Sequence, residues 1–212
     1  MPVITAIEPQ KKNKDRVNVY IEGEYAFSVG METAYHFQMK KGKEISYDAL
    51  NAAVREDNEK YGFDLAVRYL SYAMRTQKEM EDYLKRKEMD EGVIQQVIQK
   101  LAHYNYIDDE QYARAYLTDH LNFGGKSIKL LAYQLGQKGI SKETIQSVLS
   151  DEDYQKEEEN LEHLVKNLMQ KNQNLEKRKR NDKIMRSLAS KGYQYGQIRP
   201  LIEQLGDDID EE

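Results

Sequence analysis

The chain has 212 residues and no cysteine, which excludes a disulfide framework and a thiolate metal site. Hydrophobic residues make up 39% and charged residues 33%, with only 3 prolines, a composition typical of a helix-rich protein with a large exposed surface. The sequence contains no run of about 18 apolar residues, the length needed to span a membrane, and no signal peptide is evident. We therefore expect a cytoplasmic protein.

Charge is arranged in blocks that alternate in sign. The net charge is −5, and the last six residues, "DDIDEE", include five acids. Residues 163–191 instead hold nine basic and two acidic residues. The distribution of charge matters more than its sum for binding an anion, so this basic block is a candidate contact surface. A solvated helix face is the simpler explanation of any single block.

The first thirty residues predict a small antiparallel sheet of three strands. After the segment "VITAI", apolar residues alternate from Val17 to Ile21 and again from Tyr25 to Val29, with a turn at Glu22-Gly23 between them. From Ser46 onward the apolar spacing becomes three and four residues, which is the spacing of helices.

Three segments then repeat one pattern without gaps, at residues 75–101, 126–152 and 179–205, with periods of 51 and 53. Their aligned apolar positions are Met80/Leu131/Ile184, Leu84/Leu135/Leu188, Ile94/Ile145/Ile198, Val97/Val148/Leu201 and Ile98/Leu149/Ile202, and Lys87, Lys138 and Lys191 align as well. Each segment predicts two helices, with a left-handed glycine closing the first at Gly139 and Gly192 and an N-cap opening the second at Asp90 and Ser141.

A further helix precedes each pair, so we predict a mainly α fold. It consists of about three tandem three-helix repeats, stacked into a curved array and preceded by a small antiparallel β-sheet. The expected parts are a β region with a short helix (1–46), a connecting helix (47–61), three repeats (62–108, 109–153 and 154–206) and a disordered acidic tail (207–212).

The segment "GGKS", residues 124–127, resembles the end of a phosphate-binding loop. Five residues before Gly125, where that loop needs its first glycine, stands His120, and the preceding segment predicts a helix rather than a strand. We therefore predict no nucleotide binding here. Gly124-Gly125 instead joins two helices of a repeat, and Lys126 takes the register position of Arg75 and Lys179.

These features together resemble the RecX family, bacterial regulators of the RecA recombinase. The resemblance lies in "YNYIDDEQYARAYL" (104–117), "GGKSIKLLAYQLGQKGI" (124–140) and "MRTQKEMEDYLKRK" (74–87), and it covers about residues 62–205. It implies a monomeric, non-enzymatic protein without a cofactor that binds in the groove of the RecA–single-stranded DNA filament. There it would limit strand exchange, ATP hydrolysis and the co-protease activity of the SOS response.

Outward-facing cations are the candidate contacts to RecA or DNA. Arg75, Lys126 and Lys179 are expected almost opposite the apolar stripe, where one cation in each repeat could form a ladder that follows phosphates or an acidic protein groove. Exposed helix positions are commonly charged in any protein, so the charge of any single one of these residues needs no functional explanation. The candidates are Arg75, Lys78, Lys126, Lys129, Lys138, Arg178, Lys179, Arg180, Lys183, Arg186 and Lys191.

The other residue types predict no chemistry. The 4 histidines lack metal-ligand spacing, and no nucleophile, base and orienting group can be proposed together, so we expect neither a metal site nor an active site. The 16 tyrosines are expected to pack between helices, with base stacking as the lesser alternative. Two other functions stay open: a duplex-DNA binder, because "KGISKETIQSVL" (138–149) resembles a helix-turn-helix, and a protein-binding scaffold without nucleic acid.

Overall fold

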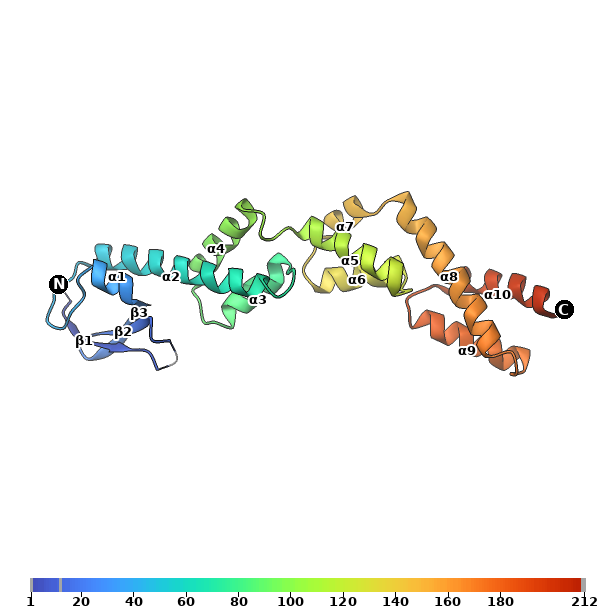
Figure 1. Cartoon of the computed structure of the whole chain (residues 1–212), viewed down its shortest axis with the longest axis horizontal. Coiled ribbons are helices and arrows are strands. Elements are labelled where there is room, and N and C mark those ends of the chain that lie inside the picture. The colour runs from blue at the N-terminus through green and yellow to red at the C-terminus, as the bar shows by residue number, and fades with distance from the viewer. Residues whose placement is uncertain (1, 12, 211–212) are drawn as a thin grey trace. The chain divides into compact units, whose positions relative to one another are not determined.

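The computed structural model describes residues 2–11 and 13–210, apart from the side chains of residues 49 and 206–210. The chain divides into two compact units, here called unit 1 (to Ile107) and unit 2 (from Asp108). As Figure 1 shows, unit 1 contains the sheet and the first repeat, and unit 2 contains only helices. The predicted fold class, a helical protein with an N-terminal antiparallel sheet, is confirmed.

The sheet of unit 1 has the order β1-β2-β3, with antiparallel pairing throughout. Its strands are β1 (Ile4–Pro9), β2 (Arg16–Ile21) and β3 (Glu24–Gly30), and the short helix α1 (Met31–His36) follows. Glu22 and Gly23 have φ of 53° and 88°, the two left-handed residues of a hairpin turn whose twist matches that of the strands. One face of the sheet, including Val19 and Val29, is buried in a core of its own.

A buried ion pair joins this sheet to α2 (Tyr47–Leu70). Arg16 Nη1 donates to Asp57 Oδ2 at 3.0 Å, and both side chains are less than a tenth exposed. Asp57 also accepts from the Gly30 amide at 2.9 Å and from the Thr33 hydroxyl. The Arg16 guanidinium lies 4.2 Å from the ring centroid of Tyr61. Because each charge has several partners, the pair compensates for its burial and fixes how α2 packs on β3.

Each repeat consists of three helices, as predicted, and these helices enclose an apolar core of their own. Repeat 1 comprises the end of α2 with α3 (Gln77–Lys85) and α4 (Glu91–His103); repeat 2 comprises α5 (Asp109–Phe123), α6 (Ile128–Gln137) and α7 (Lys142–Val148); repeat 3 comprises α8 (Asp151–Lys171), α9 (Lys177–Ala189) and α10 (Tyr195–Asp210). The expected stripe is confirmed, since Met80/Leu84, Leu131/Leu135 and Ile184/Leu188 are all fully buried.

The connecting helix and the first helix of repeat 1 are one element, whereas the sequence predicted separate helices at 47–61 and 62–74. The predicted boundary falls at Gly62, which lies inside the continuous α2. A Cβ at this position would lie 2.9 Å from the terminal methyl of Met89. Gly62 therefore permits close packing against the α3–α4 turn and does not end the helix.

The second helix of every repeat ends in the same left-handed turn. Gly139 and Gly192 have φ of 91° and 92°, as predicted, and the next residue donates its amide to a carbonyl of the preceding helix. In repeat 1 this position is Glu88, with φ of 59°, and the amide of Met89 donates to the Leu84 carbonyl at 3.3 Å. The predicted N-caps are also confirmed, since Asp90 and Ser141 accept from amides in the first turn of their helices.

Repeats 2 and 3 meet within unit 2 at the N-terminus of α6. The Ser127 amide donates to the Lys191 carbonyl at 2.9 Å, and the Ile128 amide donates to Glu157 Oε1 at 2.7 Å. Gly192 packs against this end of α6, because a Cβ there would lie 2.5 Å from that of Leu130. Two amides that a helix end leaves unsatisfied thus bind the neighbouring repeat.

The acidic tail differs in part from its prediction. The backbone of residues 207–210, expected to be disordered, continues α10, because an existing helix propagates at little cost. Residues 211–212 lie outside the described residues.

We predict that Asp57→Ala destabilises unit 1 by about 3–5 kcal/mol, because it leaves the buried Arg16 charge without its carboxylate. Urea denaturation followed by circular dichroism would measure the loss. The control is Lys60→Ala, which removes the exposed Lys60–Glu32 pair and should cost less than about 1 kcal/mol. Equal losses in the two variants would contradict the role given to the buried pair.

The pH dependence of stability tests the contact between repeats 2 and 3. Burial raises the pKa of Glu157, and the bond from the Ile128 amide only partly offsets this effect. Since the folded state holds the proton more tightly, the Glu157 contribution to stability is greatest below the ordinary pKa of 4.5 and falls as pH rises through the raised value. Glu157→Gln keeps an acceptor oxygen without the charge.

We therefore expect Glu157→Gln to be at least as stable as the parent at pH 7, with an advantage that shrinks as pH falls toward 4.5. Glu157→Ala should instead lose about 1–3 kcal/mol, because the Ile128 amide is left without a partner. Urea denaturation of the three proteins between pH 4 and pH 7, at about unit intervals, would measure this linkage. An advantage of the Gln variant that grows on acidification would contradict the assignment.

Candidate binding surface

The predicted contact cations differ in exposure. Exposed cations are Lys78, Lys129, Arg178, Lys179, Lys183 and Arg186, whereas Arg75, Lys126, Lys138 and Lys191 are half-buried. Arg180 is buried on the same stripe of α9 as Ile184 and Leu188. It therefore does not lie on the surface of unit 2, contrary to the prediction, because its spacing places it on the core side of the helix.

Arg75, Lys126 and Lys179 share a register position but are not equivalent in the structure. The residue after Arg75 or Lys126 is the hydroxyl N-cap of α3 or α6, so both cations lie just before a helix. Repeat 3 has Arg180 in place of that hydroxyl, and α9 begins earlier, at Lys177. Lys179 therefore lies within a helix, and the expected equivalence does not extend to repeat 3.

In repeat 1 two cations lie against a pair of stacked rings, here called the repeat-1 stack (Arg75, Tyr69, Tyr83 and Lys87). The Arg75 guanidinium is 4.5 Å from the Tyr69 centroid, and the rings of Tyr69 and Tyr83 are 4.1 Å apart at an interplanar angle of 9°. Lys87 Nζ lies 5.5 Å from the Tyr83 centroid. The cations are thus held by ring faces, an attraction of about 0.5–2 kcal/mol each.

A related arrangement, here called the repeat-2 face, joins α5 to α6 (Lys126, Gln134, Tyr116, Tyr112 and Lys138). Gln134 Oε1 accepts from Lys126 Nζ at 3.2 Å and from the Tyr116 hydroxyl at 2.8 Å. The rings of Tyr116 and Tyr112 stack at 6.2 Å, and Lys138 Nζ lies 5.4 Å from the Tyr112 centroid. Burial raises the pKa of Tyr116, which remains a neutral donor.

His120 lies at the Lys126 end of the repeat-2 face. Its ring contacts Tyr116 edge-on at 4.3 Å. Burial lowers the pKa of His120, and the charge of Lys126 lowers it further, against a smaller opposite effect of Asp119. The imidazole is therefore neutral at physiological pH, and the positive charge here belongs to lysine.

The two arrangements occupy equivalent positions, since Arg75 and Lys87 stand 51 residues before Lys126 and Lys138. Lys87 was absent from the candidates, although its alignment with Lys138 was the signal that could have identified it. The expectation that tyrosines pack between helices is correct for Tyr69, Tyr83, Tyr112 and Tyr116. The Lys87–Tyr83 contact spans one helical turn, whereas Arg75–Tyr69 and Lys138–Tyr112 join residues from separate segments, which the repeat pattern does not predict.

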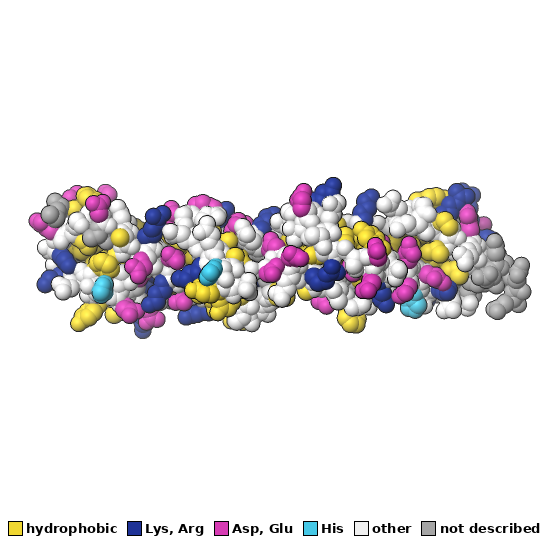
Figure 2. Space-filling view, turned by 90° about the horizontal axis from the view of Figure 1, so that it is seen from above, with side chains coloured by type: hydrophobic (Ala, Val, Ile, Leu, Met, Phe, Trp, Pro, Cys, Tyr) yellow, Lys and Arg dark blue, Asp and Glu magenta, His cyan; other side chains and the backbone are white. Residues whose placement is uncertain are grey.

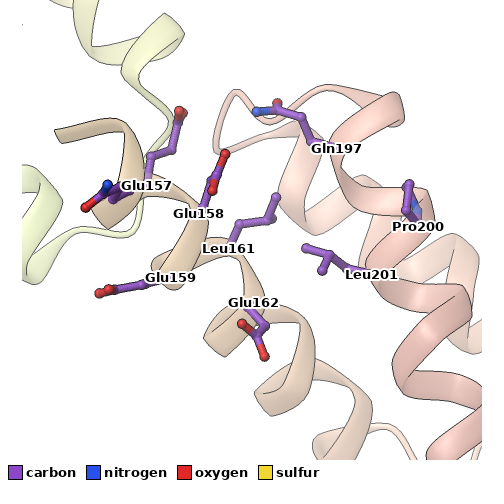
Figure 3. Close-up of a pocket in the computed structure, with 9 residues that line it drawn as sticks. Glu157, Glu158, Glu159, Leu161, Glu162, Gln197, Pro200 and Leu201 are labelled. Atoms are coloured by element: carbon purple, nitrogen blue, oxygen red, sulfur yellow. The ribbon is translucent and has the colours of Figure 1, made fainter. Parts of the chain in front are cut away.

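Elsewhere the surface is mixed in charge. Figure 2 shows cations and acids interspersed on the visible face, without a wide area of one sign. A cleft of about 590 Å³ lies between α8 and α10, with Leu161 and Leu201 at its apolar part. Its acidic residues are Glu157, Glu158, Glu159 and Glu162 (Figure 3). Such a cleft repels phosphates, so it is not an anion site.

Among the side chains that the structure describes, no three histidine or acidic groups converge where a metal ion could bind. In the same part of the chain, no helix combines the length and apolar composition needed to cross a membrane. The described surface of the repeats therefore presents cations and rings in fixed positions, groups that can bind a partner.

Comparison with known proteins covers nearly the whole chain. Four family models match in order: "Regulatory protein RecX N-terminal domain" at residues 2–46, and the first, second and third three-helix domains of RecX at 63–101, 108–149 and 156–202. The chain belongs to the RecX family. The RecX match thus extends beyond the repeats, where the resemblance was seen, to the sheet.

Curated RecX relatives align over most of their own length. The regulatory protein RecX of Bacillus subtilis is 35% identical over 212 residues, covering 100% of this chain and 80% of the relative. That of Clostridium acetobutylicum is 37% identical over 208 residues, covering 95% of each. The crystal structure of RecX from Lactobacillus salivarius matches 71% of this chain and 98% of its own, with 30% identity and a TM-score of 0.63. Another RecX crystal structure covers 96% and 100%, with 28% identity and a TM-score of 0.67.

We predict that Lys126→Met raises the pKa of His120, because it removes a positive charge that disfavours the imidazolium. An NMR titration of the imidazole ring protons would measure the change. Lys129→Met, which removes an exposed cation three residues further along the chain, should leave the His120 titration at the parent value. The same shift in both variants would show that the general charge of α6, and not Lys126, sets this pKa.

Proposed function

We propose that this protein is a non-enzymatic regulator of the RecA recombinase. It binds in the groove of the RecA–single-stranded DNA filament as a monomer and without a cofactor. Occupying that groove limits strand exchange, ATP hydrolysis and the co-protease activity that drives the SOS response. The proposal places the working protein in the cytoplasm, where its target filament forms.

The observation that carries this proposal is the ordered match of all four RecX domains. It supports a regulatory role for the whole chain, since relatives named as regulatory proteins align with it from end to end. The RecA partner comes from the family resemblance of the three sequence motifs. A protein that presents fixed cations can compete for an anionic groove without any catalytic group.

The cations of unit 2 support a polyanionic or acidic partner. Lys129, Lys183 and Arg186 are exposed on α6 and α9. Repeats 2 and 3 are joined through buried hydrogen bonds, so the cations of the two helices belong to one compact body. Several charges held in one body bind together, and the resulting affinity falls with added salt.

A helix-turn-helix that reads duplex DNA is the alternative function, but α7 supports it poorly. This helix has only seven residues and buries Ile145 and Val148 in the core of repeat 2. Lys142 is the single cation in its range. Sedimentation with RecA–DNA filaments and with naked duplex separates these functions, and a scaffold without a nucleic-acid role would sediment with neither.

We predict that changing Lys126, Lys129, Lys179 and Arg186 together to glutamate abolishes inhibition of the DNA-dependent ATPase of RecA. Four charges are reversed, which lowers the net charge by eight units, while the apolar stripe is untouched. The fold should survive, with losses of about 0.5 kcal/mol or less at each of the three exposed sites and about 1 kcal/mol at the half-buried Lys126, which loses its bond to Gln134. Filament co-sedimentation and ATPase rates at several salt concentrations would measure the effect, and helical circular dichroism would confirm folding.

The matched control changes Lys14, Lys40, Lys41 and Lys142, four other exposed lysines, to glutamate and so has the same net charge. We expect the control to inhibit RecA nearly as well as the parent does. A folded quadruple variant that inhibits at the parent concentration would remove these cations from the contact surface. Equal loss in variant and control would indicate a general charge effect instead.

A further inference from the structure

Two aromatic side chains are almost fully exposed at equivalent places in repeats 1 and 2. Tyr72 is 84% exposed and Phe123 is 88% exposed, and they stand 51 residues apart, in the repeat register. Each lies where the first helix of its repeat ends, three residues before Arg75 or Lys126. A phenylalanine this exposed gains nothing from the core, so its ring is available to an external partner.

The cation three residues after each ring is not neutralised by an acid. Among the side chains that the structure describes, neither Arg75 nor Lys126 forms an ion pair. Arg75 is held by the face of Tyr69, and Lys126 by the side-chain carbonyl of Gln134. These contacts position the charge and leave it uncompensated. A guanidinium stacked on a ring still presents the N–H donors of its edge to an anion.

Repeat 3 is a natural contrast. The position equivalent to Tyr72 and Phe123 is Glu176, and its carboxylate lies 3.3 Å from Nζ of Lys179, the equivalent of Arg75 and Lys126. The same three-residue spacing therefore relates an exposed ring to a cation held by uncharged groups in two repeats, and an N-cap carboxylate to a paired lysine in the third. Only the first two can offer a π face and a charge together.

We infer that Tyr72–Arg75 and Phe123–Lys126 are two equivalent contact elements for single-stranded nucleic acid, in which the ring stacks on a base and the cation binds a phosphate. The inference deepens the proposed function by assigning part of the contact with the RecA–DNA filament to the nucleic acid. It rests on the proposed function only for the claim that this filament is the target. We infer a single strand and not a duplex because unpaired bases expose the ring faces that stacking inside a duplex covers.

The variation between the two elements favours nucleic acid over a protein partner. The second element has phenylalanine where the first has tyrosine, and lysine where the first has arginine. If both elements bind the same partner, that partner requires neither the hydroxyl nor the guanidinium. What the elements share is an exposed ring and a positive charge, which any nucleotide can use without sequence preference. A protein pocket that accepted a tyrosine hydroxyl would leave its polar group unpaired against phenylalanine.

The test measures binding of a fluorescein-labelled oligo-dT by anisotropy, with oligo-rU as a second probe to separate DNA from RNA. We expect Tyr72→Ala with Phe123→Ala to weaken binding by about 5-fold or more for each stacked base lost. Tyr35→Ala, which removes another ring that is 88% exposed but belongs to α1, is the matched control and should bind as the parent does.

Salt dependence distinguishes the two halves of each element. Arg75→Gln and Lys126→Gln should each reduce the slope of log K against log salt by about 0.7, the value for one phosphate contact on a single strand. The ring variants should lower affinity with the slope unchanged. In a gain-of-function arm, Glu176→Phe frees Lys179 and provides the missing ring, so binding to oligo-dT should tighten.

Three outcomes would overturn the inference. In the first, the ring variants bind oligo-dT as tightly as Tyr35→Ala does. In the second, they lose as much affinity for duplex DNA as for oligo-dT. In the third, they keep oligo-dT binding but lose RecA inhibition, which would mean that the rings contact a protein. Failure of the proposed function is separate, because it appears as a parent protein that binds oligo-dT but does not inhibit RecA.

Discussion

The amides of Ser127, the N-cap of α6, and of Ile128, its first residue, are the groups on which the organisation of unit 2 depends. A helix N-terminus leaves its amides without intrahelical partners, and burying them between two repeats is possible only if the second repeat supplies acceptors. The Lys191 carbonyl and the Glu157 carboxylate do so, at 2.9 and 2.7 Å. Gly192 must then lack a side chain, because the approach leaves no room for one. Packing between the repeats therefore fixes the end of the helix on which Lys126 and Lys129 depend for their position.

Cations on this protein are positioned in two ways, with different consequences for binding. Lys166 pairs with Glu162 on α8, and Lys179 pairs with Glu176 at the N-cap of α9, which offsets part of each positive charge. Arg75 and Lys126 are instead positioned by a ring and an amide oxygen, which are uncharged. The second way preserves the full electrostatic attraction while reducing the entropy lost on binding. A chain of net charge −5 can in this way retain local sites for anions.

Periodic and local features of the fold could be predicted from the sequence, whereas contacts between helices could not. The hairpin at Glu22-Gly23, the buried stripe and the closing glycines follow from residue type and spacing, and all are present. The continuity of α2 through Gly62 was missed, because a glycine that permits close packing looks the same as one that ends a helix.

The candidate surface was predictable only in outline. The register identified Arg75 and Lys126, but whether a cation rests on a ring or pairs with an acid depends on side chains from another helix. The burial of Arg180 follows from its place four residues before Ile184, in a helix that begins earlier than the repeat alignment predicted. The exposure of Phe123 was likewise missed, since an aromatic residue at the end of an apolar helix is usually part of a core.

The unbroken α2 also has a mechanical consequence. Its 24 residues form a rod about 36 Å long. Asp57 clamps the first half of this rod to the sheet, and Tyr69, near its far end, carries Arg75. No proline interrupts the sequence of α2, so nothing of that kind kinks the helix between the two contacts. One helix thus ties the position of Arg75 to the packing of the sheet, although the sheet contributes no candidate contact of its own.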